Sequence, residues 1–159
     1  MNPPDQTPKK NILITGASGL IGAKLIKNLQ DKGYFVSVLS RNPDKLKGVK
    51  AFKWNTEEQT IDNNALKDVD TIIHLAGAGI ADARWTKSRK QLIIDSRVLS
   101  TRLLYKAIEE TKAPVKTIIS ASAVGFYGDR ADEILNENST NGTGFLAECC
   151  QQWAAAIYR

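Results

Sequence analysis

Two kinds of segment alternate along the chain, and they differ in the spacing of their apolar residues. Short runs of Ile, Leu, Val and aromatic residues are typical of strands in a parallel sheet covered on both faces. Five such runs are predicted as strands: residues 11–15, 35–39, 49–54, 71–75 and 115–121. Apolar residues at helical spacing predict three helices: residues 20–31, 88–111 and 144–159. The order predicts an α/β fold with a doubly wound parallel sheet, which binds ligands at the carboxyl ends of its strands.

A glycine-rich turn joins the first predicted strand to the first predicted helix. Residues 12–22 read Ile-Leu-Ile-Thr-Gly-Ala-Ser-Gly-Leu-Ile-Gly. Gly16 permits a tight turn, Gly19 lets the backbone approach a pyrophosphate, and Gly22 lets the helix pack closely on the sheet. The helix N-terminus adds free N–H groups and the positive end of the helix dipole. The pattern predicts a dinucleotide site in a Rossmann-like sheet, with the pyrophosphate at this turn.

The residues after the second predicted strand indicate which dinucleotide binds. A site for NAD has an acidic residue there, which binds the ribose 2′-hydroxyl. This chain has Ser40 and Arg41 instead. A hydroxyl and a planar guanidinium suit a 2′-phosphate, because the guanidinium can donate paired, charge-assisted hydrogen bonds. We therefore expect NADP (NADPH) as the cofactor; the alternative is that Arg41 is a solvated residue opening the turn Arg-Asn-Pro-Asp.

Composition limits the other function classes. The chain has 159 residues, 42% of them hydrophobic, which suits one globular domain over residues 11–159 after a disordered polar tail at 1–10. The formal charge of +5 is spread along the chain among acidic residues, so we expect no nucleic-acid partner. No apolar run has the length of a membrane span, and the N-terminus lacks a signal-peptide core.

The two cysteines are adjacent, at positions 149 and 150, inside a predicted helix. A disulfide between neighbouring residues would be strained, and no further ligands accompany the pair, so we predict neither a disulfide nor a metal site. A reducing cytoplasm fits this cysteine usage best.

Several stretches carry a family resemblance. Four of them resemble the extended short-chain dehydrogenases/reductases: residues 15–22, 40–43, 74–78 and 122–128. Others resemble one atypical branch, the NAD-dependent epimerase/dehydratase-like proteins, many of which have no assigned substrate: residues 78–80, 84–85, 96–98, 100–101 and 145–148, with Trp153. The resemblance covers residues 11–159.

The resemblance implies the contacts with the cofactor. The pyrophosphate would be held by the turn residues Gly16, Ala17, Ser18, Gly19, Leu20, Ile21 and Gly22. Leu75, Ala76 and Gly77 match the segment that the family packs against the adenosine ribose. Arg97 matches a cofactor-facing position of the long helix, where most extended members have Asn; the alternative is a cation on the helix surface. His74 is the only histidine and lies at a strand end beside apolar residues, which favours a buried structural group over a catalytic base.

The catalytic pattern of the superfamily is incomplete in this chain. Reduction in that superfamily uses a Tyr, a Lys four residues further on, and a Ser or Thr that holds the substrate oxygen. Ser122 matches the Ser, but the expected Tyr and Lys fall at Phe145 and Cys149. Tyr127 is the remaining candidate for a phenol, and two roles stay open for it: acid–base catalysis or shaping the pocket. Glu148 is either a proton donor or a solvent-facing helix residue.

The length of the chain adds a last expectation. Relatives of this type continue for about as many residues again, with a further strand and a smaller substrate-binding lobe, so we expect a sheet truncated after about five strands. Surfaces exposed by that truncation predict self-association. Two functions stay open: an NADP-dependent oxidoreductase or epimerase-like enzyme acting on a carbonyl or nucleotide-sugar type substrate, and a non-catalytic dinucleotide-binding sensor or assembly protein.

Overall fold

The computed structural model describes residues 10–157. Residues 1–9 of the predicted tail and the last two residues of the predicted helix at 144–159 lie outside the described residues. Within this range the chain forms six strands: β1 (Asn11–Thr15), β2 (Phe35–Ser40), β3 (Lys50–Asn55), β4 (Thr60–Ile61), β5 (Thr71–His74) and β6 (Thr117–Ser120). It also forms three α-helices: α1 (Leu20–Asp31), α2 (Lys87–Thr111) and α3 (Phe145–Ile157). Short 3-10 turns lie at η1 (Pro43–Lys45), η2 (Asn63–Leu66) and η3 (Val124–Tyr127).

The strands form one sheet in the order β4-β3-β2-β1-β5-β6. β1 lies between β2 and β5, and all strands except β4 run parallel. The predicted doubly wound parallel sheet is therefore confirmed, and each predicted strand is present with its ends shifted by at most two residues. The expected number of strands was too low by one. β4 pairs antiparallel with β3 over two residues only, which is too short to produce an alternating pattern in the sequence.

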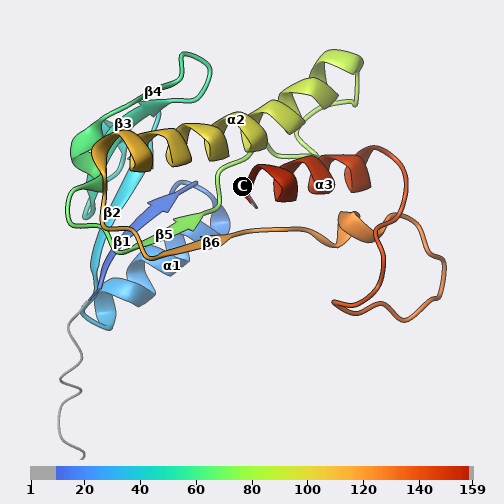
Figure 1. Cartoon of the computed structure of the whole chain (residues 1–159), viewed down its shortest axis with the longest axis horizontal. Helices are drawn as coiled ribbons and strands as arrows, with labels where there is room; N and C mark the ends of the chain where they lie inside the picture. Colours follow the sequence, from blue (N-terminus) through green and yellow to red (C-terminus); the bar gives the residue numbers. More distant parts are fainter. Residues whose placement is uncertain (1–9, 158–159) are drawn as a thin grey trace, which may run out of the picture.

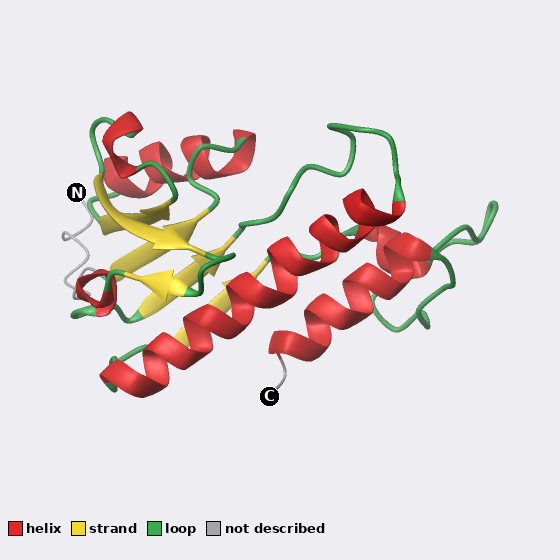
Figure 2. Ribbon diagram, turned by 90° about the horizontal axis from the view of Figure 1, so that it is seen from above, coloured by secondary structure: helices red, strands yellow, loops and turns green. Residues whose placement is uncertain are grey.

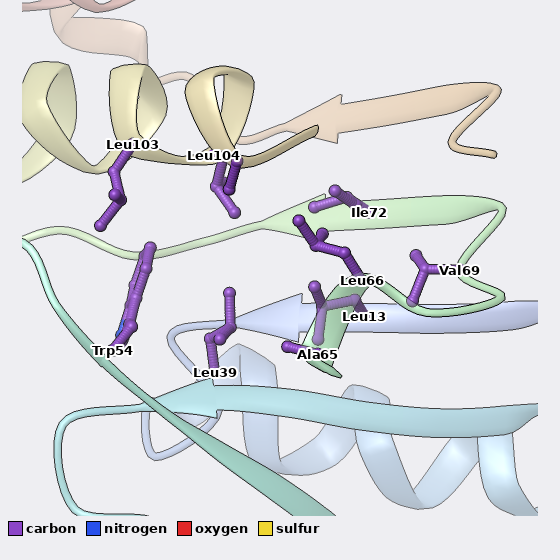
Figure 3. Close-up of a cluster of buried hydrophobic side chains, with 10 residues drawn as sticks. Leu13, Leu39, Trp54, Ala65, Leu66, Val69, Ile72, Leu103 and Leu104 are labelled. Carbon is purple, nitrogen blue, oxygen red and sulfur yellow. The ribbon is translucent and has the colours of Figure 1, made fainter. Parts of the chain in front are cut away.

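Helices cover both faces of the sheet, with α1 on one side and α2 on the other (Figure 1). Successive side chains of a strand point to opposite faces, so β1 supplies apolar residues to both layers. Ile12 and Ile14 lie in the cluster beneath α1, whereas Leu13 lies beneath α2. Leu103 and Leu104 of α2 point into that second cluster (Figure 3). A fully buried leucine of this kind contributes roughly 1.5–3 kcal/mol.

The third helix packs beside α2 (Figure 2). Its buried side includes Ala147, Cys149, Cys150 and Trp153. The connections at the ends of β1, β5 and β6 lead away from the same edge of the sheet, because these strands are parallel. Among residues 10–157, no helix is both long enough and apolar enough to cross a membrane.

Candidate functional site

The glycine turn after β1 touches the chain where it leaves β5. Gly16 has a φ angle of +72°, which a residue with a side chain rarely adopts. A Cβ atom on Gly16 would lie 2.7 Å from the carbonyl oxygen of Leu75. β1 leads on to β2 on one side, while β5 lies on its other side, so this contact marks the point where the strand order reverses. Ligands of open α/β sheets bind in the crevice at such a point.

The helix that follows the turn begins without a capping side chain. Gly19 occupies the N-cap and donates its N–H to the carbonyl oxygen of Gly16 at 3.0 Å. The first turn of α1 contains no acidic residue, and a Cβ atom on Gly22 would collide with the Gly16 carbonyl oxygen. Leu20 and Ile21 are 92% and 67% exposed, although both are large and apolar. Backbone N–H groups and an apolar surface are therefore both exposed at the start of α1. This suits a ligand that has a phosphate next to an apolar ring.

The other residues of the turn differ in exposure. Ala17 is buried under the turn, and Ser18 is exposed at its tip. Leu75 and Ala76 are half-buried, and Gly77 is exposed. The structure therefore brings the predicted pyrophosphate segment and the predicted ribose segment to one edge of the sheet.

The hydroxyl of Thr15 joins these two segments. It accepts hydrogen bonds from the backbone N–H groups of Leu75 and Ala76, both at 3.1 Å. It also lies 2.7 Å from Nδ1 of His74. Because both lone pairs of the hydroxyl are used by the two N–H groups, its proton must be donated to Nδ1. Thr15 thus fixes both the direction in which the chain leaves β5 and the tautomer of His74.

The second ring nitrogen of His74 faces two hydroxyls of α2. Nε2 lies 3.2 Å from Ser100 Oγ and 3.1 Å from Thr101 Oγ1. Ser100 donates its proton to the carbonyl oxygen of Ser96 at 2.7 Å, and Thr101 donates to that of Arg97 at 2.7 Å. Both hydroxyls therefore accept from the Nε2–H group, so the imidazole is neutral.

Burial acts on His74 in the same direction. The side chain is 1% exposed, and burial lowers its pKa to about 4, because the charged form would lose its hydration. A fully engaged, buried and neutral imidazole does not serve as a base at the ligand crevice. His74 is therefore the structural group that the sequence favoured.

The predicted 2′-phosphate residues lie at the carboxyl end of β2, next to β1. Ser40 is half-buried, and its Oγ accepts the N–H of Asn42 at 3.1 Å, which closes a small turn. Arg41 is exposed and makes no hydrogen bond or ion pair with any part of the chain that the structure describes. Its guanidinium is therefore free to meet an anion, as the prediction requires.

The predicted helix residue Arg97 reaches the chain beyond β5. Its Nη1 donates to the carbonyl oxygen of Ala78 at 3.1 Å, and a Cβ atom on Gly77 would lie 3.0 Å from its Cζ. The guanidinium is half-buried and lies over the ring of Trp153, with Cζ 5.3 Å from the centroid. It therefore lies against the segment that leaves β5, rather than on the outer surface of the helix.

The two catalytic candidates lie after β6. Ser122 is exposed, and Tyr127 ends the turn η3, where its ring meets that of Phe126 edge to face at 5.3 Å. Within residues 10–157, no hydrogen bond joins Ser122 to Tyr127. The structure places both on one segment and leaves their roles as predictions.

The positions of the absent Tyr and Lys lie at the start of α3. The ring of Phe145 contacts Trp85 edge to face at 5.2 Å, and Lys90 Nζ lies 5.1 Å from its centroid. Cys149 is buried, which raises the pKa of its thiol, while the charge of Arg97 lowers it by less. Neither Phe145 nor the protonated thiol exchanges a proton at neutral pH.

The sequence indicated no role for Thr15, Ser96, Ser100 and Thr101. A signal was present for the last three, because Ser96, Arg97, Ser100 and Thr101 are polar residues on the inward side of an otherwise apolar helical pattern. Their partners at the end of β5 could not be identified without the fold.

Comparisons with known proteins agree with this arrangement. The sequence pattern of the NAD dependent epimerase/dehydratase family matches residues 12–148. The "Epimerase family protein ML0860" of Mycobacterium leprae is 40% identical over 149 residues, which are 93% of this chain and 47% of that protein. A solved nucleoside-diphosphate sugar epimerase from Corynebacterium glutamicum is 40% identical, with a TM-score of 0.76 over 94% of this chain and 30% of that one.

The human epimerase family protein SDR39U1 (isoform 2), solved with NADPH, gives a TM-score of 0.77 at 26% identity, over 92% of this chain and 48% of that one. The chain spans about half the length of the epimerase family proteins that it matches.

Proposed function

Since the chain belongs to the NAD dependent epimerase/dehydratase family, we propose that it is the NADP-binding part of a short-chain dehydrogenase/reductase-like enzyme acting on a carbonyl or nucleotide-sugar type substrate. The observation that carries the proposal is the contact of Gly16 with Leu75 at the reversal of the strand order, beside the uncapped start of α1. The cofactor supplies a hydride to the reaction when it is bound.

The pyrophosphate binds at the turn after β1. Backbone N–H groups from Gly16 to Gly22 and the positive end of the α1 dipole hold it, and the adenosine ribose lies against the segment Leu75 to Gly77. The guanidinium of Arg97 lies against Gly77 of that segment. The relative solved with NADPH supports this choice of ligand class for the chain.

The preference for NADP over NAD depends on Ser40 and Arg41. An exposed guanidinium without a protein partner at the end of β2 suits the 2′-phosphate, and a charge-assisted contact of this kind contributes roughly 1.5–3 kcal/mol. We expect Arg41→Gln to weaken NADPH binding by about tenfold or more and to leave NADH binding nearly unchanged. Lys47→Gln, an exposed cation of the same connection, is the matched control.

Titration of the chain with NADPH and with NADH, followed by nucleotide fluorescence, measures both affinities. A clear preference of the unmodified chain for NADH would contradict the role of Ser40 and Arg41. Equal losses in Arg41→Gln and Lys47→Gln would reduce the effect to general surface charge.

The catalytic part of the proposal rests on Ser122 and Tyr127. Ser122 orients the substrate oxygen, and Tyr127 supplies a phenol, because Phe145 has no proton to transfer. Oxidation of NADPH in the presence of a panel of carbonyl compounds and nucleotide sugars tests this step. Turnover that is lost in both Ser122→Ala and Tyr127→Phe supports an enzyme. NADPH binding without any turnover favours the non-catalytic dinucleotide-binding protein instead.

A further inference from the structure

Two neighbouring side chains of α2 hold the backbone of Ala78 at both of its polar groups. Ser96 Oγ accepts the Ala78 N–H at 2.9 Å and donates its own proton to the carbonyl oxygen of Ile93, also at 2.9 Å. Arg97 Nη1 donates to the Ala78 carbonyl oxygen at 3.1 Å and to the Ile93 carbonyl oxygen at 2.9 Å. One residue of the loop is thus tied to one turn of the helix at two points.

The guanidinium that makes this contact is itself fixed in place. It lies over the ring of Trp153, and a Cβ atom on Gly77 would come within 3.2 Å of Nη1 as well as 3.0 Å of Cζ. Within residues 10–157, Arg97 has no carboxylate partner, so backbone carbonyl groups and an aromatic ring hold its charge. Gly77 is the residue that leaves room for this packing.

The segment between β5 and α2 has no regular structure of its own in its first part. It leaves the sheet and runs out to the start of α2 (Figure 2). At one end, Thr15 holds the N–H groups of Leu75 and Ala76. Three residues further along, Arg89 Nη2 donates to the Gly79 carbonyl oxygen. Ala78 lies between these two anchors, so the contacts from Ser96 and Arg97 decide the path of the chain past the crevice.

We propose that Ser96 and Arg97 form a clamp on Ala78 which positions the segment Leu75–Gly79 for the dinucleotide. The clamp rests on the proposed function, because that segment is the one assigned to the adenosine ribose. Ser96 and Arg97 are positioning residues in this account: they act on the ligand through the backbone that they hold. A preorganised segment raises affinity because less ordering has to occur on binding.

The competing account is a direct contact between the Arg97 charge and a ligand anion. The two accounts differ in what they require of Ser96. A direct ion pair depends on the charge at position 97, and it needs from Ser96 at most the long contact of Oγ with Arg97 Nη1 at 3.4 Å. The clamp needs both side chains, and Lys at position 97 cannot reproduce it, because an ammonium lacks the planar face that lies on Trp153 and so holds Nη1 at the Ala78 and Ile93 carbonyl groups.

The experiment compares five variants of the full chain by two measurements, the fifth being Gly77→Ala. Ser96→Ala removes one arm of the clamp, Arg97→Lys removes the other while keeping its charge, Ser96→Thr keeps the hydroxyl, and Arg102→Gln alters an exposed arginine of the same helix as a control. Amide hydrogen exchange at residues 75–79 is followed by NMR without ligand, and NADPH affinity is measured by titration. Thermal melting of each variant establishes that it is folded.

We expect Ser96→Ala and Arg97→Lys each to speed exchange at Ala78 by about fivefold, the change expected for one ordinary hydrogen bond, and to weaken NADPH binding by about threefold to tenfold. Ser96→Thr and Arg102→Gln should leave both values near those of the unmodified chain. Gly77→Ala should speed exchange in the same segment, because its Cβ atom displaces the guanidinium.

Two results would overturn the clamp. One is unchanged exchange at residues 75–79 in both Ser96→Ala and Arg97→Lys. The other is an NADPH affinity in both Arg97→Lys and Ser96→Ala equal to that of the unmodified chain, which is the result that a direct ion pair with the retained charge at position 97 predicts. If the unmodified chain binds no dinucleotide, the proposed function fails, while the exchange rates still report separately whether the clamp exists.

Discussion

Replacing Thr15 by Val would remove one hydroxyl group and keep the shape of the side chain. Thr15 is fully buried at the end of β1, so the variant changes almost no surface property of the folded chain. Its hydroxyl serves three partners at once, namely the N–H groups of Leu75 and Ala76 and Nδ1 of His74. All three would lose their partner, because no other hydrogen bond within residues 10–157 reaches either N–H group or Nδ1.

The expected cost follows from these three partners. A buried polar group left without a hydrogen bond costs roughly 1–3 kcal/mol. Leu75 and Ala76 are half-buried, so water relieves part of the loss there, and we take about 1 kcal/mol for each group. The sum is about 3 kcal/mol, which is a large fraction of the ~5–15 kcal/mol by which domains are stable.

Urea denaturation of Thr15→Val, followed by circular dichroism, measures this loss as a lower midpoint at an unchanged slope. Thr15→Ser is the matched control, because it keeps the hydroxyl and removes a methyl group at a cost of about 1 kcal/mol. A Val variant that is as stable as the Ser variant would refute the reasoning, since packing and not the hydroxyl would then stabilise the site. The same variant should also bind NADPH more weakly than Thr15→Ser does.

Three further predictions concern other parts of the molecule. The pKa of His74 is about 4 in the folded chain against 6.5 in the unfolded one, so the unfolded chain binds more protons between these values. The contribution of His74 to the free energy of unfolding is therefore fully present above about pH 6.5 and falls by roughly 3 kcal/mol as the pH is lowered towards 4. The urea midpoints of His74→Gln should vary less over this pH range than those of the unmodified chain. Gly22→Ala should lower the melting temperature, because its Cβ atom collides with the Gly16 carbonyl oxygen, and an unchanged value would contradict the close packing seen there. We also propose that the chain self-associates through the open edge of the sheet, where Ile119 of β6 is 53% exposed. Light scattering at tens of micromolar should then give a mass above that of the monomer, and Ile119→Lys should reduce this mass. A monomeric mass of the unmodified chain would rule the proposal out.

The sequence predicted the parts of the fold that have a sufficiently long apolar pattern. β1 and α1 have the predicted bounds, and α2 begins one residue earlier than predicted, at Lys87, after the N-cap Thr86 accepts the N–H of Arg89. β4 was missed because two residues show no period. Strand ends shifted where an apolar residue continues past the last ladder partner, as Leu75 does after β5.

The candidate site was predictable where a local motif defines it. The glycine turn fixes its own conformation, since Gly16 and Gly22 are needed by contacts with the nearby backbone. The partners of Arg97 were not predictable, because its guanidinium meets Ala78 across 19 positions of sequence and Trp153 across another helix. Such contacts depend on how α2 and α3 are placed, which the spacing of residues within one helix does not determine.

The hydroxyl groups of α2 also determine how far the helix can slide along its own axis. An apolar surface of similar leucines would tolerate a displacement of one turn, which is about 5.4 Å. Ser100 and Thr101 meet His74, and one turn earlier Ser96 meets Ala78, so two successive turns of α2 match two points on the chain that leaves β5. A displacement of one turn would break both matches at once and leave the Nε2–H of His74 and the N–H of Ala78 without partners. These polar contacts therefore give α2 a single register against the chain that leaves β5, and with it a single position of Ala78 along the helix.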